Sequence, residues 1–193
     1  AGKSTLLNSI AGFLPIISGR IEWKMEDITK LTAGQRPISI LFQDHNFFSH
    51  LTIENNVSIG IKPDLKLTSK QKERVSQAIE KVGLQEFRNK KPAELSGGQR
   101  TRIALARVMV RSQPLLLLDE AFLGLEPSLR SDMLNLIVEL VQKENIILLM
   151  ITHDIKDAIK LNQKILFVNE GEVFSPMHIS KFLNSSDSAI IKY

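Results

Sequence analysis

The sequence contains no cysteine, and its purely apolar runs are short. The lack of cysteine excludes a disulfide framework, a zinc site built on thiolates and a cysteine nucleophile. The clearest apolar runs, residues 115–118 and 146–151, fall far short of the roughly 20 residues that a helix needs to cross a bilayer. Such short runs are instead typical of buried strands in a parallel sheet.

The sequence also lacks a strong excess of charge. It has 25 basic and 21 acidic residues, a net charge of +4, and its basic residues are spread along the chain. We therefore expect no nucleic-acid partner. With 193 residues, of which 43% are hydrophobic and 24% charged, the composition is typical of one globular domain, or of one domain with a subdomain.

Strand-like and helix-like patterns alternate along much of the chain, which predicts βαβ units and a mostly parallel sheet. Residues 44–112 differ, because helical patterns dominate there, and we expect them to form a helical subdomain inserted into an α/β core. In sequence order, we expect strands at 38–42, 115–118, 146–152 and 165–168, and helices at 6–11, 68–83, 98–110, 129–141 and 155–161.

The first candidate site lies at the start of the chain, where Gly2, Lys3, Ser4 and Thr5 precede a helical pattern. These residues match the second half of the phosphate-binding motif G-x-x-x-x-G-K-[ST]. In that motif the glycine lets backbone N–H groups approach phosphate, the lysine reaches the β- and γ-phosphates, and the hydroxyl binds Mg²⁺. The motif's first glycine would precede Ala1, so a chance match at a helix start is the alternative.

A second candidate site follows the apolar run 115–118, which ends in Asp119 and Glu120. A buried strand that carries an aspartate at its carboxyl end is the Walker B arrangement, in which the aspartate holds Mg²⁺ through water. Glu120 would then polarise the attacking water. A hydrophobic strand that merely ends in two solvated acids is the alternative, and the phosphate-binding motif upstream makes it less favoured.

The third candidate site is the segment Ser96, Gly97, Gly98 and Gln99, which precedes a helix. Adjacent glycines leave backbone N–H groups unobstructed, and a hydroxyl near the helix start adds a further phosphate ligand. One nucleotide has no use for two such helix termini from one chain, whereas two chains arranged head to tail would use both. A glycine turn that only caps a helix is the alternative.

These segments, in this order, resemble the nucleotide-binding subunits of ABC transporters over the whole of residues 1–193. The resemblance implies an α/β P-loop NTPase (RecA-like) fold, with ATP and Mg²⁺ as ligands. It also assigns two residues that carry little signal alone. Gln43 matches the Q-loop glutamine, which implies contact with Mg²⁺ and coupling to the membrane subunit. His153 matches the switch histidine, which implies contact with the γ-phosphate.

A narrower resemblance rests on residues 36–43, 46–52 and 59–67, which are similar to the ATPases of bacterial thiamine importers. It implies a subunit that hydrolyses ATP to energise uptake of thiamine or thiamine phosphates. Importers of iron, molybdate, sulfate and polyamines share parts of the first segment, so another small solute stays open. A non-transport ABC ATPase and an inactive truncated remnant stay open as well.

The resemblance also implies partners and a location. The partners would be transmembrane permease subunits, a second copy of the chain in a head-to-tail homodimer and, indirectly, a periplasmic solute-binding protein. The subunit would lie peripherally at the cytoplasmic face of the bacterial inner membrane. Phe47, Phe48, Leu51 and Ile53 follow the Q-loop glutamine, and we expect some of them to form local core and others to dock a coupling helix of the permease.

The sequence departs from the family pattern in three places. The first strands and the first half of the phosphate loop have no counterpart, so we expect a chain truncated at its N-terminus. Ala121 stands where the family usually has proline, and residues 123–126 stand where it usually has Ser-Ala-Leu-Asp. Because Glu126 is one methylene longer than aspartate, we expect weaker coupling between the two nucleotide sites.

Overall fold

The computed structural model describes residues 2–42 and 46–184. The chain divides into two compact units, one formed by Pro37–Met150 and the other by Ala1–Arg36 together with Ile151–Tyr193. Each unit is described by itself below. The predicted helical subdomain at 44–112 lies within the first of these units and stays a prediction.

A three-stranded sheet forms the base of the Pro37–Met150 unit. Its order is β3-β4-β5, with β3 at Ile38–Phe42, β4 at Leu115–Asp119 and β5 at Ile147–Ile151. Strands β3 and β4 pair in parallel, in a register that sets Phe42 opposite Asp119. Four leucines of β4 are buried, as the apolar run predicts. The expected strands and the parallel pairing are therefore confirmed here.

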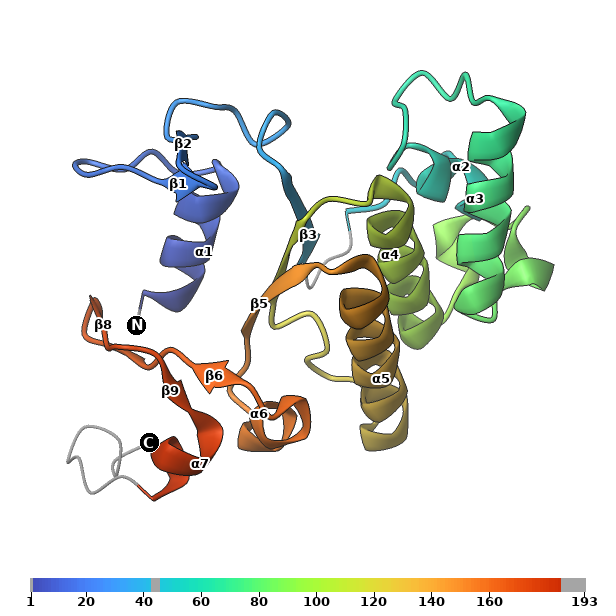
Figure 1. The fold of residues 1–193 in the computed structure, drawn as a ribbon. Coiled ribbons are helices and arrows are strands. Elements are labelled where there is room, and N and C mark those ends of the chain that lie inside the picture. Colours follow the sequence, from blue (N-terminus) through green and yellow to red (C-terminus); the bar gives the residue numbers. More distant parts are fainter. Residues whose placement is uncertain (1, 43–45, 185–193) are drawn as a thin grey trace. The chain divides into compact units, whose positions relative to one another are not determined.

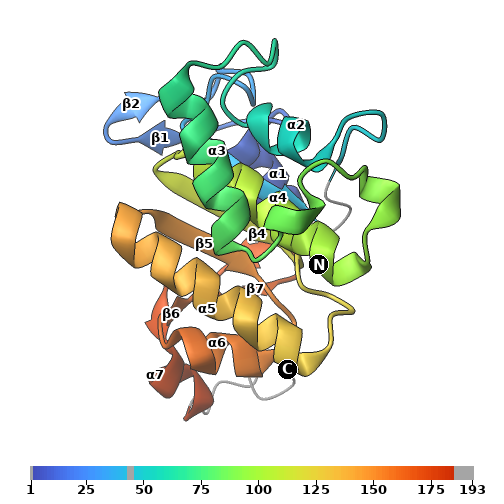
Figure 2. The same cartoon turned by 90° about the vertical axis from the view of Figure 1, so that its right-hand side faces the viewer.

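Two long helices, α4 (Gly97–Arg111) and α5 (Pro127–Glu144), lie on the same face of this sheet (Figures 1 and 2). The apolar stripe predicted for α5 is buried at Met133, Ile137 and Leu140. Helix α4 is buried along much of its length, because it lies between the sheet on one side and two further helices on the other (Figure 1).

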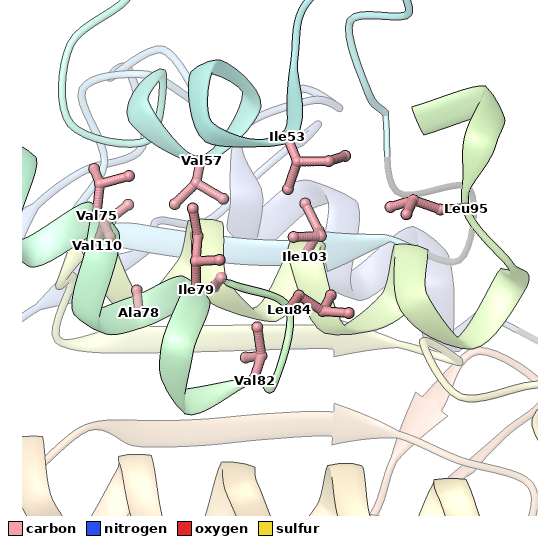
Figure 3. Packing of buried hydrophobic residues seen from close by; sticks show 11 residues of the cluster. Ile53, Val57, Val75, Ala78, Ile79, Val82, Leu84, Leu95, Ile103 and Val110 are labelled. Atoms are coloured by element: carbon pink, nitrogen blue, oxygen red, sulfur yellow. The ribbon is translucent and has the colours of Figure 1, made fainter. Parts of the chain in front are cut away.

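The two further helices are α2 (Ile53–Ser58) and α3 (Ser69–Lys81), and two short 3₁₀ turns at Gln85–Phe87 and Pro92–Glu94 follow them. Thr68 caps α3 and forms a capping box with Gln71, which confirms the predicted start of this helix. The side chains between α2, α3 and α4 form one apolar core (Figure 3). Among its members, Ile53, Val57, Ile79 and Ile103 have no exposed surface. Helix α2 was not predicted as a separate element.

A buried polar network fastens residues 46–52 to this core. The Asn56 amide nitrogen donates to the carbonyl oxygens of Phe48 and Leu51 at 3.0 and 3.1 Å. The Arg107 guanidinium on α4 donates to the Asn56 side-chain oxygen at 3.0 Å and lies over the Phe47 ring, 4.9 Å from its centroid. Burial lowers the pKa of Arg107 to about 10, so it stays cationic at neutral pH.

The apolar residues after Gln43 accordingly divide into two groups. Ile53 is fully buried, and Phe47 packs against the same core. Phe48 is 46% exposed, and its ring lies edge-on to His50 with centroids 6.2 Å apart. The expectation that part of this segment is local core is confirmed, whereas the docking role of the exposed part stays a prediction.

The second unit contains helix α1 (Lys3–Ala11) and a two-residue antiparallel pair, β1 (Glu22–Trp23) with β2 (Glu26–Asp27). Arg36 is 4% exposed, and its guanidinium donates to four carbonyl oxygens. Two of these, on Ser9 and Ile10, belong to the last turn of α1, at 2.8 and 2.6 Å. The other two belong to Thr29 and Leu31, at 2.9 and 3.0 Å. Arg36 therefore ties the end of α1 to the loop that follows β2.

The rest of this unit contains α6 (Ile155–Leu161), α7 (Ile179–Leu183) and four short strands. Two antiparallel pairs form, β6 (Lys164–Ile165) with β9 (Met177–His178) and β7 (Val168–Asn169) with β8 (Glu172–Val173). The single strand predicted at 165–168 is therefore wrong. It divides because its ends pair with different partners, while Phe167 between them packs into a core with Ile179 and Phe182.

No helix within residues 2–42 and 46–184 is both long and apolar enough to span a membrane.

Candidate nucleotide-binding site

The residues predicted to bind phosphate form the N-terminal turn of α1. Gly2 caps the helix with a φ of 99°, a left-handed conformation that glycine adopts without steric cost. Its carbonyl accepts the Leu6 N–H at 2.9 Å, so the helix begins at Lys3. Ser4 and Thr5 are exposed in the first turn, which contains no acidic residue. The turn therefore carries the positive end of the helix dipole without a neutralising carboxylate of its own.

Asp119 and Glu120 lie at the carboxyl end of β4, as the apolar run predicts. Asp119 is the last residue of the strand, half-buried and opposite Phe42 of β3. Gln43, the predicted Q-loop glutamine, lies outside the described residues. Glu120 has a φ of 47°, a conformation that costs a residue with a side chain about 1–2 kcal/mol. Other described residues with a side chain, among them the C-cap residues Ser112 and Asn145, share this conformation, so it does not by itself mark Glu120 as functional.

The Ser96 segment forms a complete capping box at the start of α4. The Ser96 hydroxyl oxygen accepts the Gln99 N–H at 3.3 Å, and the Gln99 side-chain oxygen accepts the Ser96 N–H at 2.9 Å. This arrangement orders the helix terminus and leaves the hydroxyl proton of Ser96 available for donation to a ligand. Ser96 is exposed and Gln99 half-buried.

The two glycines of this segment have different surroundings. A Cβ built on Gly98 would lie 2.3 Å from a methyl group of Leu129 on α5. Close packing of α4 against α5 is therefore enough to explain why position 98 is a glycine. A Cβ built on Gly97 would meet no described atom within 4 Å, so close packing inside the described structure does not require this glycine. The open space over Gly97 is what a site for an approaching external group needs.

His153 is exposed in the short turn between β5 and α6. One hydrogen bond joins the residues on either side of the histidine, because the Thr152 hydroxyl oxygen accepts the Asp154 N–H at 3.0 Å. Asp154 then caps α6 by accepting the Lys156 N–H at 2.9 Å. The backbone that carries the imidazole is therefore held by side-chain hydrogen bonds on both sides.

The predicted site residues are shared between the two units. Gly2, Lys3, Ser4, Thr5 and His153 belong to one unit, whereas Ser96, Gly97, Gly98, Gln99, Asp119 and Glu120 belong to the other. Within the Pro37–Met150 unit, Ser96 caps the start of α4, and β4 ends at Asp119, with Glu120 directly after it. Gly98 on α4 packs against Leu129 in the first turn of α5.

The donor set suits Mg²⁺ bound together with phosphate. Mg²⁺ takes oxygen ligands, keeps several waters and is usually held by one or two side chains plus substrate phosphates. The Ser4 hydroxyl in one unit and the Asp119 carboxylate in the other are each an oxygen donor of the kind that Mg²⁺ takes. Across the described part of the chain, no group of three or more His, Asp or Glu side chains could hold a metal ion.

Four polar residues that organise these elements were not found by sequence reasoning. They share burial or partial burial: Arg36, Asn56, Arg107 and Asp157. Arg36, Asn56 and Arg107 also form hydrogen bonds to residues far along the chain. A single sequence marks an arginine or asparagine as a surface residue, so no signal distinguished these from the others.

Comparison with known proteins identifies the family of the chain. The family model described as ABC transporter matches residues 1–123. The chain therefore belongs to the ABC transporter family, and the predicted α/β P-loop NTPase fold and ABC ATPase class are confirmed.

The similar curated proteins carry a common name. The "Thiamine import ATP-binding protein ThiQ" of Ruegeria sp. (strain TM1040) is 44% identical over 193 residues, which is 100% of this chain and 84% of the relative. The proteins of the same name from Chelativorans sp. (strain BNC1) and Yersinia pestis are each 46% identical, over 95% and 90% of this chain and 74% and 73% of the relatives.

Proposed function

We propose that the chain is the ATP-hydrolysing subunit that energises a bacterial importer for thiamine or thiamine phosphates. The observation that carries this proposal is 44% identity over the whole chain to a protein named for thiamine import. The candidate site supplies the chemistry, because its residue types and local geometry suit phosphate binding and water activation.

In this proposal two copies of the chain bind two ATP molecules between them. Each nucleotide contacts Gly2, Lys3, Ser4 and Thr5 of one copy and the Ser96 helix terminus of the other. Lys3 neutralises the β- and γ-phosphates, and the Ser96 hydroxyl donates to the γ-phosphate from the opposite side. The open space over Gly97 supports such an approach, because a side chain there would occupy it.

Hydrolysis is an in-line attack of water on the γ-phosphate. Glu120 accepts a hydrogen bond from that water and orients it, and His153 donates to the γ-phosphate as charge builds on its oxygens. Mg²⁺, when bound, neutralises the phosphate charge, and Ser4, Asp119 and Gln43 would hold it. Most of the rate then comes from position and charge rather than from covalent chemistry.

The partners and location follow from the same proposal. Permease subunits would bind the ATPase dimer at the cytoplasmic face of the inner membrane, and a periplasmic binding protein would deliver the solute to them. No residue of the ATPase would contact the solute, so the identity of the solute must be tested by transport.

Two measurements test the proposal. The first is ATP hydrolysis by the purified chain with Mg²⁺, compared with Glu120→Gln, which keeps the size of the side chain and removes its basicity. We expect Glu120→Gln to bind a fluorescent ATP analogue and to lose nearly all hydrolysis. Equal hydrolysis by the two forms would refute the role of Glu120, and failure of the unaltered chain to bind the analogue would indicate an inactive remnant.

The second measurement is uptake of labelled thiamine by cells that express the chain with its permease and lack any other thiamine importer. Uptake that Glu120→Gln abolishes would support the proposal. Hydrolysis without thiamine uptake would indicate an importer for another solute or a non-transport ATPase, and parallel uptake of molybdate, sulfate, iron and polyamines separates these.

A further inference from the structure

A buried carboxylate, that of Asp157, lies in the first turn of α6, directly after the turn that carries His153. Asp157 is 3% exposed, although it is a residue type that is almost never fully buried unless it is paired. Its Oδ2 atom accepts a hydrogen bond from the Thr152 hydroxyl at 2.8 Å. The Thr152 hydroxyl, which belongs to this turn, is therefore a hydrogen-bond partner of the buried Asp157 carboxylate.

The hydroxyl of Thr152 joins this carboxylate to the backbone around the histidine. A hydroxyl has one proton to donate, and the 2.8 Å distance to Asp157 is much shorter than the 3.5 Å distance to the Asp154 carbonyl. With the proton directed to Asp157, a lone pair of the hydroxyl oxygen accepts the Asp154 N–H at 3.0 Å. The two hydrogen bonds therefore support each other, and both require the same rotamer of Thr152.

We infer that Asp157, acting through Thr152, is a positioning residue for His153. The carboxylate fixes the Thr152 rotamer, the Thr152 oxygen fixes the Asp154 N–H, and the backbone of His153 between them is held in one conformation. This inference rests on the proposed function, in which His153 contacts the γ-phosphate. A hydrogen bond to a phosphoryl group in the transition state requires the imidazole to be held in place before the reaction, so loss of the network slows hydrolysis rather than nucleotide binding.

The test removes the network from either end and measures single-turnover ATP hydrolysis by the transporter assembled with its permease. Thr152→Val keeps the shape of the side chain and removes the hydroxyl, and Asp157→Leu removes the acceptor. Thr152→Ser, which keeps the hydroxyl, is the matched control. We expect each of the first two variants to lower the hydrolysis rate at least about tenfold, with the KM for ATP within about twofold, whereas Thr152→Ser stays near the unaltered rate.

The decisive comparison repeats Thr152→Val and Asp157→Leu in a His153→Ala background. If the network acts only by positioning the imidazole, neither substitution lowers the residual rate further once the imidazole is gone. Equal losses in both backgrounds would mean a merely structural role and would overturn the inference. No loss in the unaltered background, or no effect of His153→Ala itself, would overturn it as well. In either case the unaltered transporter would still hydrolyse ATP, whereas failure of the ATPase role on which the inference rests would remove hydrolysis from the unaltered transporter too.

Discussion

Replacing Arg36 with methionine should destabilise the unit that contains α1 by several kcal/mol. The side chain is 4% exposed and makes four hydrogen bonds to carbonyl oxygens, at 2.6 to 3.0 Å. Burial lowers the pKa of its guanidinium, yet an arginine remains charged at neutral pH. Methionine has a similar length, so the loss would report the hydrogen bonds rather than a cavity.

The magnitude follows from the number and type of these bonds. Hydrogen bonds with a charged partner contribute about 1.5–3 kcal/mol each, and the cost of burying the cation offsets part of their sum. Removing one partner from a buried charged network typically costs about 3–5 kcal/mol, and we expect Arg36→Met to fall in that range. With a urea m-value of about 2 kcal/mol/M, a loss of 3 kcal/mol lowers the unfolding midpoint by about 1.5 M.

The assay is urea unfolding followed by the fluorescence of Trp23, the chain's only tryptophan. Trp23 lies on β1 in the same unit as Arg36. Arg20→Met is the matched control, because Arg20 is 70% exposed and pairs with Glu22 on the surface. Such pairs contribute about 0–1 kcal/mol. A midpoint for Arg36→Met as high as that of Arg20→Met would refute the assignment of Arg36 as the anchor of α1.

Three further substitutions test other parts of the account. Ser39→Ala should raise the urea midpoint, because the buried Ser39 hydroxyl has no hydrogen-bond partner among the residues that the structure describes and removing such a group gains about 1 kcal/mol; a lowered midpoint would contradict this. Gly97→Ala should keep or slightly raise the midpoint and lower ATP hydrolysis at least about tenfold. Gly34→Ala is its control, since it too has open space at the Cβ position, and hydrolysis equal to that of Gly34→Ala would show that nothing approaches Gly97. Glu126→Asp should stabilise α5 by about 0.5–1 kcal/mol in urea unfolding, because Glu126 occupies the N-cap without a side-chain hydrogen bond and aspartate is among the best N-cap residues; an unchanged midpoint would argue against this.

Features that depend on neighbouring residues were predictable from the sequence. Thr68 and Ser96 cap their helices through residues three positions later, so the signal and its partner lie in one short window. The leucines of β4 are buried because the run is uniformly apolar. Asp119 then follows at the carboxyl end of the strand, which is where ligands bind in parallel sheets.

Features that depend on distant partners were not predictable. The acceptors of Arg36 on α1 lie 26 and 27 residues away, and Arg107 reaches Asn56 across 51 residues. The predicted strand at 165–168 divides because Ile165 pairs with Met177 and Val168 pairs with Val173, partners that the local pattern does not reveal. The left-handed conformation of Glu120 is likewise set by the surrounding fold rather than by its own propensity.

We propose above all that this chain converts ATP hydrolysis into thiamine import, and one measurement tests that proposal most directly. The chain is assembled with its permease in proteoliposomes, and ATP hydrolysis is measured with and without the thiamine-loaded binding protein on the opposite side of the membrane. The account predicts hydrolysis that rises several-fold with the loaded binding protein and is nearly abolished by Glu120→Gln. Hydrolysis that does not respond to thiamine, or that persists in Glu120→Gln, would contradict it.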